Sequence, residues 1–202
     1  MHMARHVSGD AGRLFRICRR GLSSAPVFTK RILLVWHSRT GLARQMSDAA
    51  EMGAHAAAEE MGCGQSDFSV LRRRARDATV EDVLGSDGYI FCGPENLASA
   101  SGEMLEFFHR SYYDCFDESE ASRLAGRPYG LAIAAGSDGS NAARQLERIC
   151  RGWRLRAVTD TIVHRNGEPQ TASAILRAKT CSEDARERCA ELGGLVAATV
   201  LL

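Results

Sequence analysis

Residues 38–43 combine side chains and backbone that suit the binding of an anion. Ser38 and Thr40 carry hydroxyls, Arg39 carries a positive charge, and Gly41 allows a tight turn. The segment lies between an apolar run and a helical pattern, so the free N–H groups of a helix start would add to the site. We predict a phosphate site there, with an ordinary Ser/Thr helix cap as the alternative interpretation; its members are Ser38, Arg39, Thr40, Gly41, Leu42 and Ala43.

Two later segments are also built from small and polar residues. Residues 93–102 follow a second apolar run and exceed the two to six residues that usually join a strand to a helix. Residues 136–141 follow a third apolar run and include two glycines, which give a permissive backbone. In an open parallel sheet, ligands bind outside the carboxyl ends of the strands. The three segments would then enclose a space the size of a mononucleotide.

The pattern of apolar residues along the chain indicates the strands and helices that position these segments. Continuous apolar runs predict buried strands at 32–36, 89–92 and 129–135, and weaker patterns predict strands at 67–72 and 155–163. Apolar residues three or four apart predict helices at 41–61, 104–112, 142–153 and 185–196, and Thr79 begins a further helix. Strands that alternate with helices imply a parallel sheet with helices on both faces.

Composition limits the class of protein. The chain has 202 residues, enough for one domain, and its 45% hydrophobic and 25% charged residues are average for a globular protein. The formal net charge of +1 gives no reason to expect nucleic acid or membrane as the main partner. There are seven cysteines and no C-x-x-C spacing, so we expect free thiols in a reducing compartment and no metal site.

The first 29 residues differ from the rest of the chain. Up to residue 30 there is one acid, Asp10, against six basic residues: Arg5, Arg13, Arg16, Arg19, Arg20 and Lys30. We predict that residues 1–29 are a disordered basic extension of a domain at 30–202. A mitochondrial transit peptide and a start codon placed too early are the alternatives. The expected location is accordingly the cytoplasm, or the mitochondrial matrix if the extension is a transit peptide.

The three small-residue segments, in this order, resemble those of flavodoxin-fold proteins of the NAD(P)H-dependent FMN reductase and quinone reductase group. Residues 38–43 resemble the phosphate loop of that group. Residues 93–97 with 101–102 resemble the loop along the isoalloxazine ring, and residues 135–139 resemble the third flavin loop. The resemblance covers residues 30–202. It implies an α/β fold, a three-layer α-β-α sandwich with a five-stranded parallel sheet in the order 2-1-3-4-5.

The resemblance also implies a cofactor and a reaction. FMN would take electrons from NAD(P)H and pass them to a quinone or similar small acceptor. Residues 38–43 would hold the phosphate, and the ring would meet Pro94, Glu95, Asn96 and Leu97 on one side and Ser137, Asp138 and Gly139 on another. By analogy we expect a homodimer or homotetramer. Flavin chemistry needs no catalytic triad, and the one possible catalytic side chain is His164, at the end of the last strand.

Two features depart from the family pattern. Ala43 replaces the last hydroxyl of the phosphate loop, a loss of about 1 kcal/mol if nothing compensates. The flavin segments lack the aromatic pair of electron-carrier flavodoxins, and Trp36 is better explained as a core anchor. Three hypotheses therefore remain: a reductase, an electron carrier, and a domain that has lost its flavin. The domain lacks the strongly acidic face typical of a carrier.

Other residues carry weaker signals. His37 lies beside the phosphate loop, but a histidine at a strand end is commonly a packing residue. The basic run at 72–76 is a solvated edge or a place for the 2′-phosphate of NADPH. Residues 169–176 resemble a segment of uncharacterised members of the group, and no chemistry is assigned to them.

Overall fold

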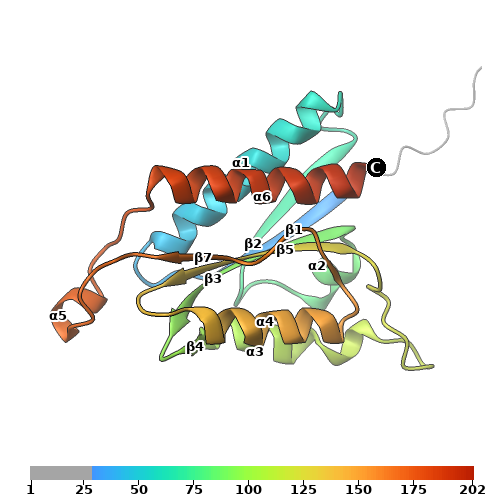
Figure 1. Cartoon of the computed structure of the whole chain (residues 1–202). Helices are drawn as coiled ribbons and strands as arrows, with labels where there is room; N and C mark the ends of the chain where they lie inside the picture. The colour runs from blue at the N-terminus through green and yellow to red at the C-terminus, as the bar shows by residue number, and fades with distance from the viewer. Residues whose placement is uncertain (1–28) are drawn as a thin grey trace, which may run out of the picture.

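The computed structural model describes residues 29–202, which form a parallel sheet covered by helices on both faces (Figure 1). The sheet order is β2-β1-β3-β5, followed by a last position that two short strands share. The strands are β1 (Lys30–Trp36), β2 (Phe68–Arg74), β3 (Gly88–Asn96), β5 (Pro128–Ala135), β6 (Arg156–Ala157) and β7 (Ile162–Arg165). The predicted fold class and the order 2-1-3-4-5 are confirmed.

The last position of the sheet differs from the prediction of one strand over 155–163. β6 pairs with the start of β5 and β7 with its end, both in parallel. Tyr129 faces Ala157 and Ala132 faces Ile162, so residues 158–161 bulge out opposite two residues of β5. Because four residues stand opposite two, they cannot all pair with β5, and the expected single strand is divided into β6 and β7.

Helices from separate parts of the chain cover the two faces (Figure 1). Helices α1 (Leu42–Glu60) and α6 (Glu183–Leu201) pack on one face. Helices α2 (Val80–Leu84), α3 (Gly102–Ser111) and α4 (Ser140–Gly152) pack on the other. Two short elements, the 3-10 helix η1 (Tyr113–Cys115) and helix α5 (Ala172–Ile175), lie in the connections.

Alternation along β1 accounts for the two cores. Ile32 and Leu34 point to the α1 and α6 side, Leu33 and Val35 point to the other side, and all four are fully buried. Because successive side chains of a strand point to opposite faces, a continuous apolar run is the pattern that a strand buried on both faces requires.

Helices α1 and α6 pack closely through two glycines. A Cβ at Gly53 would lie 1.9 Å from the Ala190 carbonyl oxygen, and one at Gly193 would lie 1.8 Å from that of Ala50. Any larger residue at either position would push the helices apart. The packing fixes α6 against α1, and with it the segment that precedes α6.

The predicted extension at 1–29 lies outside the described residues, except for Thr29, whose hydroxyl donates to the Ser66 carbonyl at 2.8 Å. Within residues 29–202, no helix has the length and apolar character needed to cross a bilayer. The six cysteines of this range are free thiols, as predicted: Cys63, Cys92, Cys115, Cys150, Cys181 and Cys189.

Candidate functional site

Residues 38–43, the predicted phosphate loop, join β1 to α1 at the carboxyl edge of the sheet. Gly41 precedes the first residue of α1 with φ 89°, a left-handed conformation that glycine adopts without strain. Its N–H donates to the Ser38 hydroxyl at 3.0 Å. No side chain of the described residues caps α1. The N–H groups of the first helical turn are therefore available to an anion, which the helix dipole also favours.

Residues 93–102 do not form the loop that their composition predicted. β3 continues through Pro94 to Asn96, and β4 (Ser99–Ala100) turns back on it as an antiparallel hairpin. The central residues of the turn, Leu97 and Ala98, have φ values of 52° and 58°. Positive φ at both central positions is the mark of a type I′ turn, which usually holds Asn or Gly. The hairpin thus presents the fully exposed Leu97 side chain on a strained backbone.

Glu95 connects this hairpin to the third segment. Its carboxylate accepts hydrogen bonds from the Ser137 N–H at 3.2 Å, the Ser137 hydroxyl at 3.1 Å and the Gly139 N–H at 3.0 Å. Asp138 points elsewhere, to an ion pair with Arg165 at 2.9 Å. Bonding to Ser140 lowers the pKa of Asp138, with a smaller effect of Arg165. The carboxylate of Glu95 therefore accepts hydrogen bonds from N–H groups of the loop that we expected to face the flavin.

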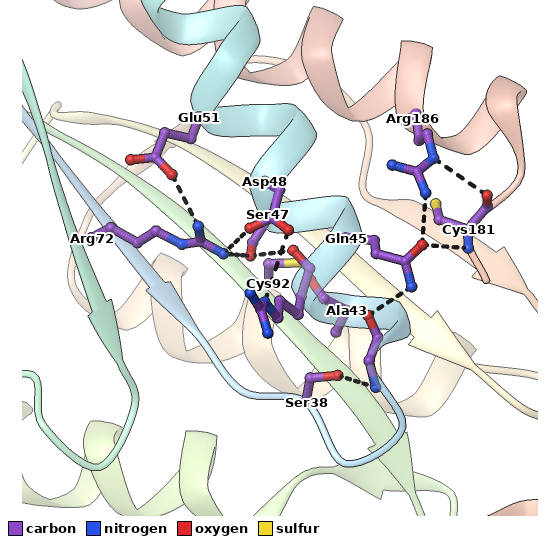
Figure 2. Close-up of polar contacts among 12 residues, drawn as sticks. Ser38, Ala43, Gln45, Ser47, Asp48, Glu51, Arg72, Cys92, Cys181 and Arg186 are labelled. Atoms are coloured by element: carbon purple, nitrogen blue, oxygen red, sulfur yellow. Dashed lines mark hydrogen bonds and ion pairs between the residues drawn. The ribbon is translucent and has the colours of Figure 1, made fainter. Parts of the chain in front are cut away.

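A segment before α6 closes the site from the other side. Lys179 donates its backbone N–H to the Thr40 carbonyl at 2.8 Å. Gln45 of α1 donates to the Lys179 carbonyl at 2.8 Å. It also accepts from the Cys181 N–H at 3.2 Å and from Arg186 at 2.6 Å (Figure 2). Residues 179–181 are thereby fixed to the phosphate loop and to α1.

The side chain of Lys179 is 4% exposed. Its ammonium group donates to the Glu168 carboxylate at 3.1 Å and to the Ala174 carbonyl at 2.7 Å. An ammonium has three N–H donors, so one remains for another partner. Gln170 fixes the same segment to the third loop, because its amide donates to the Gly136 carbonyl at 2.7 Å.

These elements surround a cavity of ≈ 250 Å³ at the carboxyl edge of the sheet. Ten predicted residues line it: Ser38, Arg39, Thr40, Leu42, Ala43, Pro94, Glu95, Asn96, Leu97 and Ser137. Gly41, Asp138 and Gly139 are adjacent to the lining but not part of it. The structure therefore brings the three predicted segments together around one space.

Eight further residues line the cavity; Ala98 and Gly136 belong to the predicted segments, and the others come from parts of the chain that the sequence did not connect with the site. The eight residues are Ala98, Ala134, Gly136, Asn166, Gln170, Ile175, Leu176 and Lys179. Residues 169–176, which carried no assigned chemistry, thus form one wall of the cavity. The one available signal was the apolar pair Ile175–Leu176 in a polar surrounding.

The cavity has two chemically different parts. The phosphate loop offers N–H groups, hydroxyls and the exposed Arg39. Leu97, Ile175 and Leu176 are large apolar side chains that are 101%, 46% and 61% exposed, and all three line the same cavity. Exposed apolar side chains gathered at one place mark a binding surface. The arrangement suits a ligand with an anionic end and a flat apolar body.

Other candidate residues lie away from this cavity. His164 is on β7, opposite Ala134, and does not line it. The thiol of Cys92 is completely buried and donates to the carbonyl of the lining residue Ala43 at 3.1 Å. Burial raises the pKa of this thiol well above its usual range, which disfavours the reactive thiolate form.

His37 and Trp36 have structural contacts. A ring nitrogen of His37 is 2.8 Å from the Ser101 hydroxyl, and the other is 3.4 Å from the Glu103 carboxylate. Burial lowers the pKa of His37 more than Glu103 raises it. Trp36 packs against the core on the α1 side, in agreement with an anchoring role.

Comparison with known proteins supports the fold. No protein-family model matches the chain. A curated flavodoxin of Aquifex aeolicus (strain VF5) is 24% identical over 178 residues, which cover 85% of this chain and 88% of that protein.

Solved structures agree with this comparison. A flavodoxin from the domain Archaea has a TM-score of 0.61 at 13% identity over 85% of this chain and 99% of its own. An oxidoreductase of Corynebacterium diphtheriae has a TM-score of 0.61 at 17% identity over 86% and 97% of the two chains. A WrbA-like protein of Agrobacterium tumefaciens has a TM-score of 0.58 at 13% identity over 86% and 98%. The protein therefore has the flavodoxin-like fold, with its candidate site at the carboxyl edge of the sheet.

Proposed function

We propose that the protein binds FMN in the cavity and transfers electrons from NAD(P)H to a small acceptor such as a quinone. The observation that carries the proposal is the composition of the cavity wall. An uncapped helix start and three exposed aliphatic side chains face one space of ≈ 250 Å³. This volume is close to the lower end of small-molecule sites, about 300 Å³.

The residues present fit FMN. The N–H groups at the start of α1 and the Thr40 hydroxyl would hold the phosphate, and the spare donor of Lys179 would offset the hydroxyl missing at Ala43. Leu97, Ile175 and Leu176 would cover the ring and exclude water. When bound, FMN supplies the redox chemistry, because it accepts hydride from a nicotinamide and passes the electrons on.

The chain's own groups then have binding and orienting roles. Asn96 lines the cavity at the hairpin end and would offer an amide to the polar edge of the ring. Glu95 fixes the hairpin against the third loop, as its three hydrogen bonds show. Because the walls come from four separate segments, each must be in place for the ring to be oriented toward a donor.

Electron carriage between proteins is the second candidate function. It is favoured by the names of the Aquifex and archaeal relatives, both flavodoxins. The oxidoreductase of Corynebacterium diphtheriae favours an enzyme.

Anaerobic titration of the FMN-loaded protein with NADPH and with NADH separates the two functions. Bleaching of the flavin band near ~450 nm by either nucleotide supports the reductase. Retention of FMN without bleaching would exclude the reductase and favour the carrier.

A further inference from the structure

A second hollow lies on the other side of the phosphate loop, apart from the candidate flavin cavity. One part, of ≈ 260 Å³, is bordered by His37, Gly41 and Glu103. An adjoining part, of ≈ 410 Å³, reaches Asp77. Both parts share Trp36, Arg44 and Arg74, so they form one hollow, here named the arginine groove. Its defining residues are Trp36, Arg44, Arg72, Arg73, Arg74 and Arg76.

Two of the five arginines of the groove, Arg72 and Arg73, are held in close ion pairs, the second at 3.2 Å from Asp82. Arg72 is held by ion pairs with Asp48 and Glu51, as Figure 2 shows. In contrast, Arg74 makes no ion pair with any carboxylate of residues 29–202.

Two further guanidinium groups are only weakly paired. Arg44 is 65% exposed and lies 4.0 Å from Asp48 of its own helix, and Arg76 is 58% exposed and lies 3.8 Å from its neighbour Asp77. Such exposed pairs contribute little, so both groups remain available to a stronger anion.

Trp36 organises the groove. It is the register partner of Arg74 on the adjacent strand β2. The guanidinium carbons of Arg72 and Arg74 lie 5.0 Å and 5.2 Å from the centre of the indole ring. These cation–π contacts hold the planar groups in place, and an arginine fork binds phosphate through two hydrogen bonds.

We propose that the arginine groove binds the 2′-phosphate of an adenine dinucleotide, so that NADPH is the preferred electron donor. This inference deepens the proposed function. The 2′-phosphate is the group by which NADPH differs from NADH, and it is the kind of group that Arg44, Arg74 and Arg76 together would hold. Ser38 lines both the flavin cavity and the groove. A dinucleotide in the groove therefore lies at the same edge of the sheet as the flavin site.

Binding can be tested without flavin. Trp36 and Trp153 are the two tryptophans of the chain, and Trp153 is fully buried, so a ligand in the groove changes the fluorescence of Trp36. Adenosine 2′,5′-bisphosphate is titrated against adenosine 5′-diphosphate, which carries two phosphates but none on the ribose 2′ position. We expect the 2′,5′-bisphosphate to bind at least tenfold more tightly.

A double variant and a matched control test the residues. Arg74→Gln with Arg76→Gln should weaken the bisphosphate at least tenfold and leave FMN affinity unchanged. Arg151→Gln, at an exposed position on α4 on the opposite face, should change neither. Equal affinity for the two nucleotides, or equal loss in the control, would overturn the proposal. Saturable binding of polyglutamate without nucleotide preference would replace it with an acidic protein partner.

The two proposals fail separately. If the bisphosphate binds as expected but FMN does not, the nucleotide site in the arginine groove is supported and the proposed flavin function is excluded. If FMN binds and is bleached equally by NADPH and NADH, the function stands and the arginine groove has no role in donor choice.

Discussion

Lys179 donates its backbone N–H to the carbonyl of Thr40, which fixes the segment before α6 to the phosphate loop after β1. The same lysine places a buried ammonium group in the wall of the cavity. Through this connection, residues 166–179 complete a site that the ends of β1, β3 and β5 only begin. The candidate site thus depends on the C-terminal part of the chain as much as on the phosphate loop.

Replacement of Lys179 should weaken the binding of the FMN phosphate and leave the binding of the isoalloxazine ring unchanged. Lys179→Met should weaken FMN about tenfold or more, because a hydrogen bond to a charged group contributes about 1.5–3 kcal/mol. Riboflavin lacks the phosphate, so its affinity should change less than about twofold by the same argument. Equilibrium quenching of flavin fluorescence measures the dissociation constants of FMN and of riboflavin.

Arg177→Met provides the control for Lys179. Arg177 is 64% exposed, lies 3.6 Å from the same Glu168 carboxylate and does not line the cavity. The Arg177→Met variant should bind FMN and riboflavin with unchanged affinity. Equal weakening of FMN and riboflavin by Lys179→Met would show that the lysine only anchors the segment.

Sequence patterns predicted those parts of the structure that depend on local residues. The continuous apolar run of β1 and the small polar segment after it are local, and both are placed as expected. The hairpin at 93–100 was missed because Leu97 and Ala98 adopt positive φ without the usual Asn or Gly signal. The role of Lys179 was missed because it arises from tertiary contacts between distant parts of the chain.

Substitution of Gly41 should abolish FMN binding. Gly41→Val places a β-branched residue at φ 89° where the backbone must approach the phosphate. Gly62→Val is a matched control at φ 77°, with nothing within 4 Å of the added Cβ and a position beyond the other end of α1. Both should lower the melting temperature, but only Gly41→Val should lose FMN in a spectral titration. Retained FMN affinity would disprove the phosphate-loop assignment.

Substitution at the hairpin tip should raise the stability of the fold and weaken FMN binding. Leu97→Asn with Ala98→Gly supplies the residues that a type I′ turn favours, and relief of about 1 kcal/mol should raise the melting temperature by about 2–4 °C. The variant removes an exposed Leu that lines the cavity, so FMN should bind about tenfold more weakly.

A second strained residue tests whether these two effects are separate. Glu120 has φ 62° and lies in an exposed turn outside the cavity. Glu120→Asn should raise the melting temperature and leave FMN affinity unchanged. Unchanged FMN affinity in the Leu97 and Ala98 variant would remove the hairpin from the site.

Stability should fall on mild acidification because of His37. Burial lowers the pKa of His37 below its ordinary value of 6.5, so the unfolded chain binds this proton more readily than the folded protein. The unfolding free energy should therefore decrease as the pH falls below about 6.5. His37→Asn should reduce this slope in urea titrations between about pH 5 and 7. An unchanged slope in the His37 variant would assign the pH dependence to other groups.

The central claim is that the cavity at the carboxyl edge of the sheet is a flavin site. Titration of the full chain with FMN, followed by absorption from about 300 to 600 nm, tests it most directly. A saturable shift of the band near ~450 nm at one FMN per chain is the predicted result. A flavin spectrum that stays identical to free FMN at all protein concentrations would contradict it.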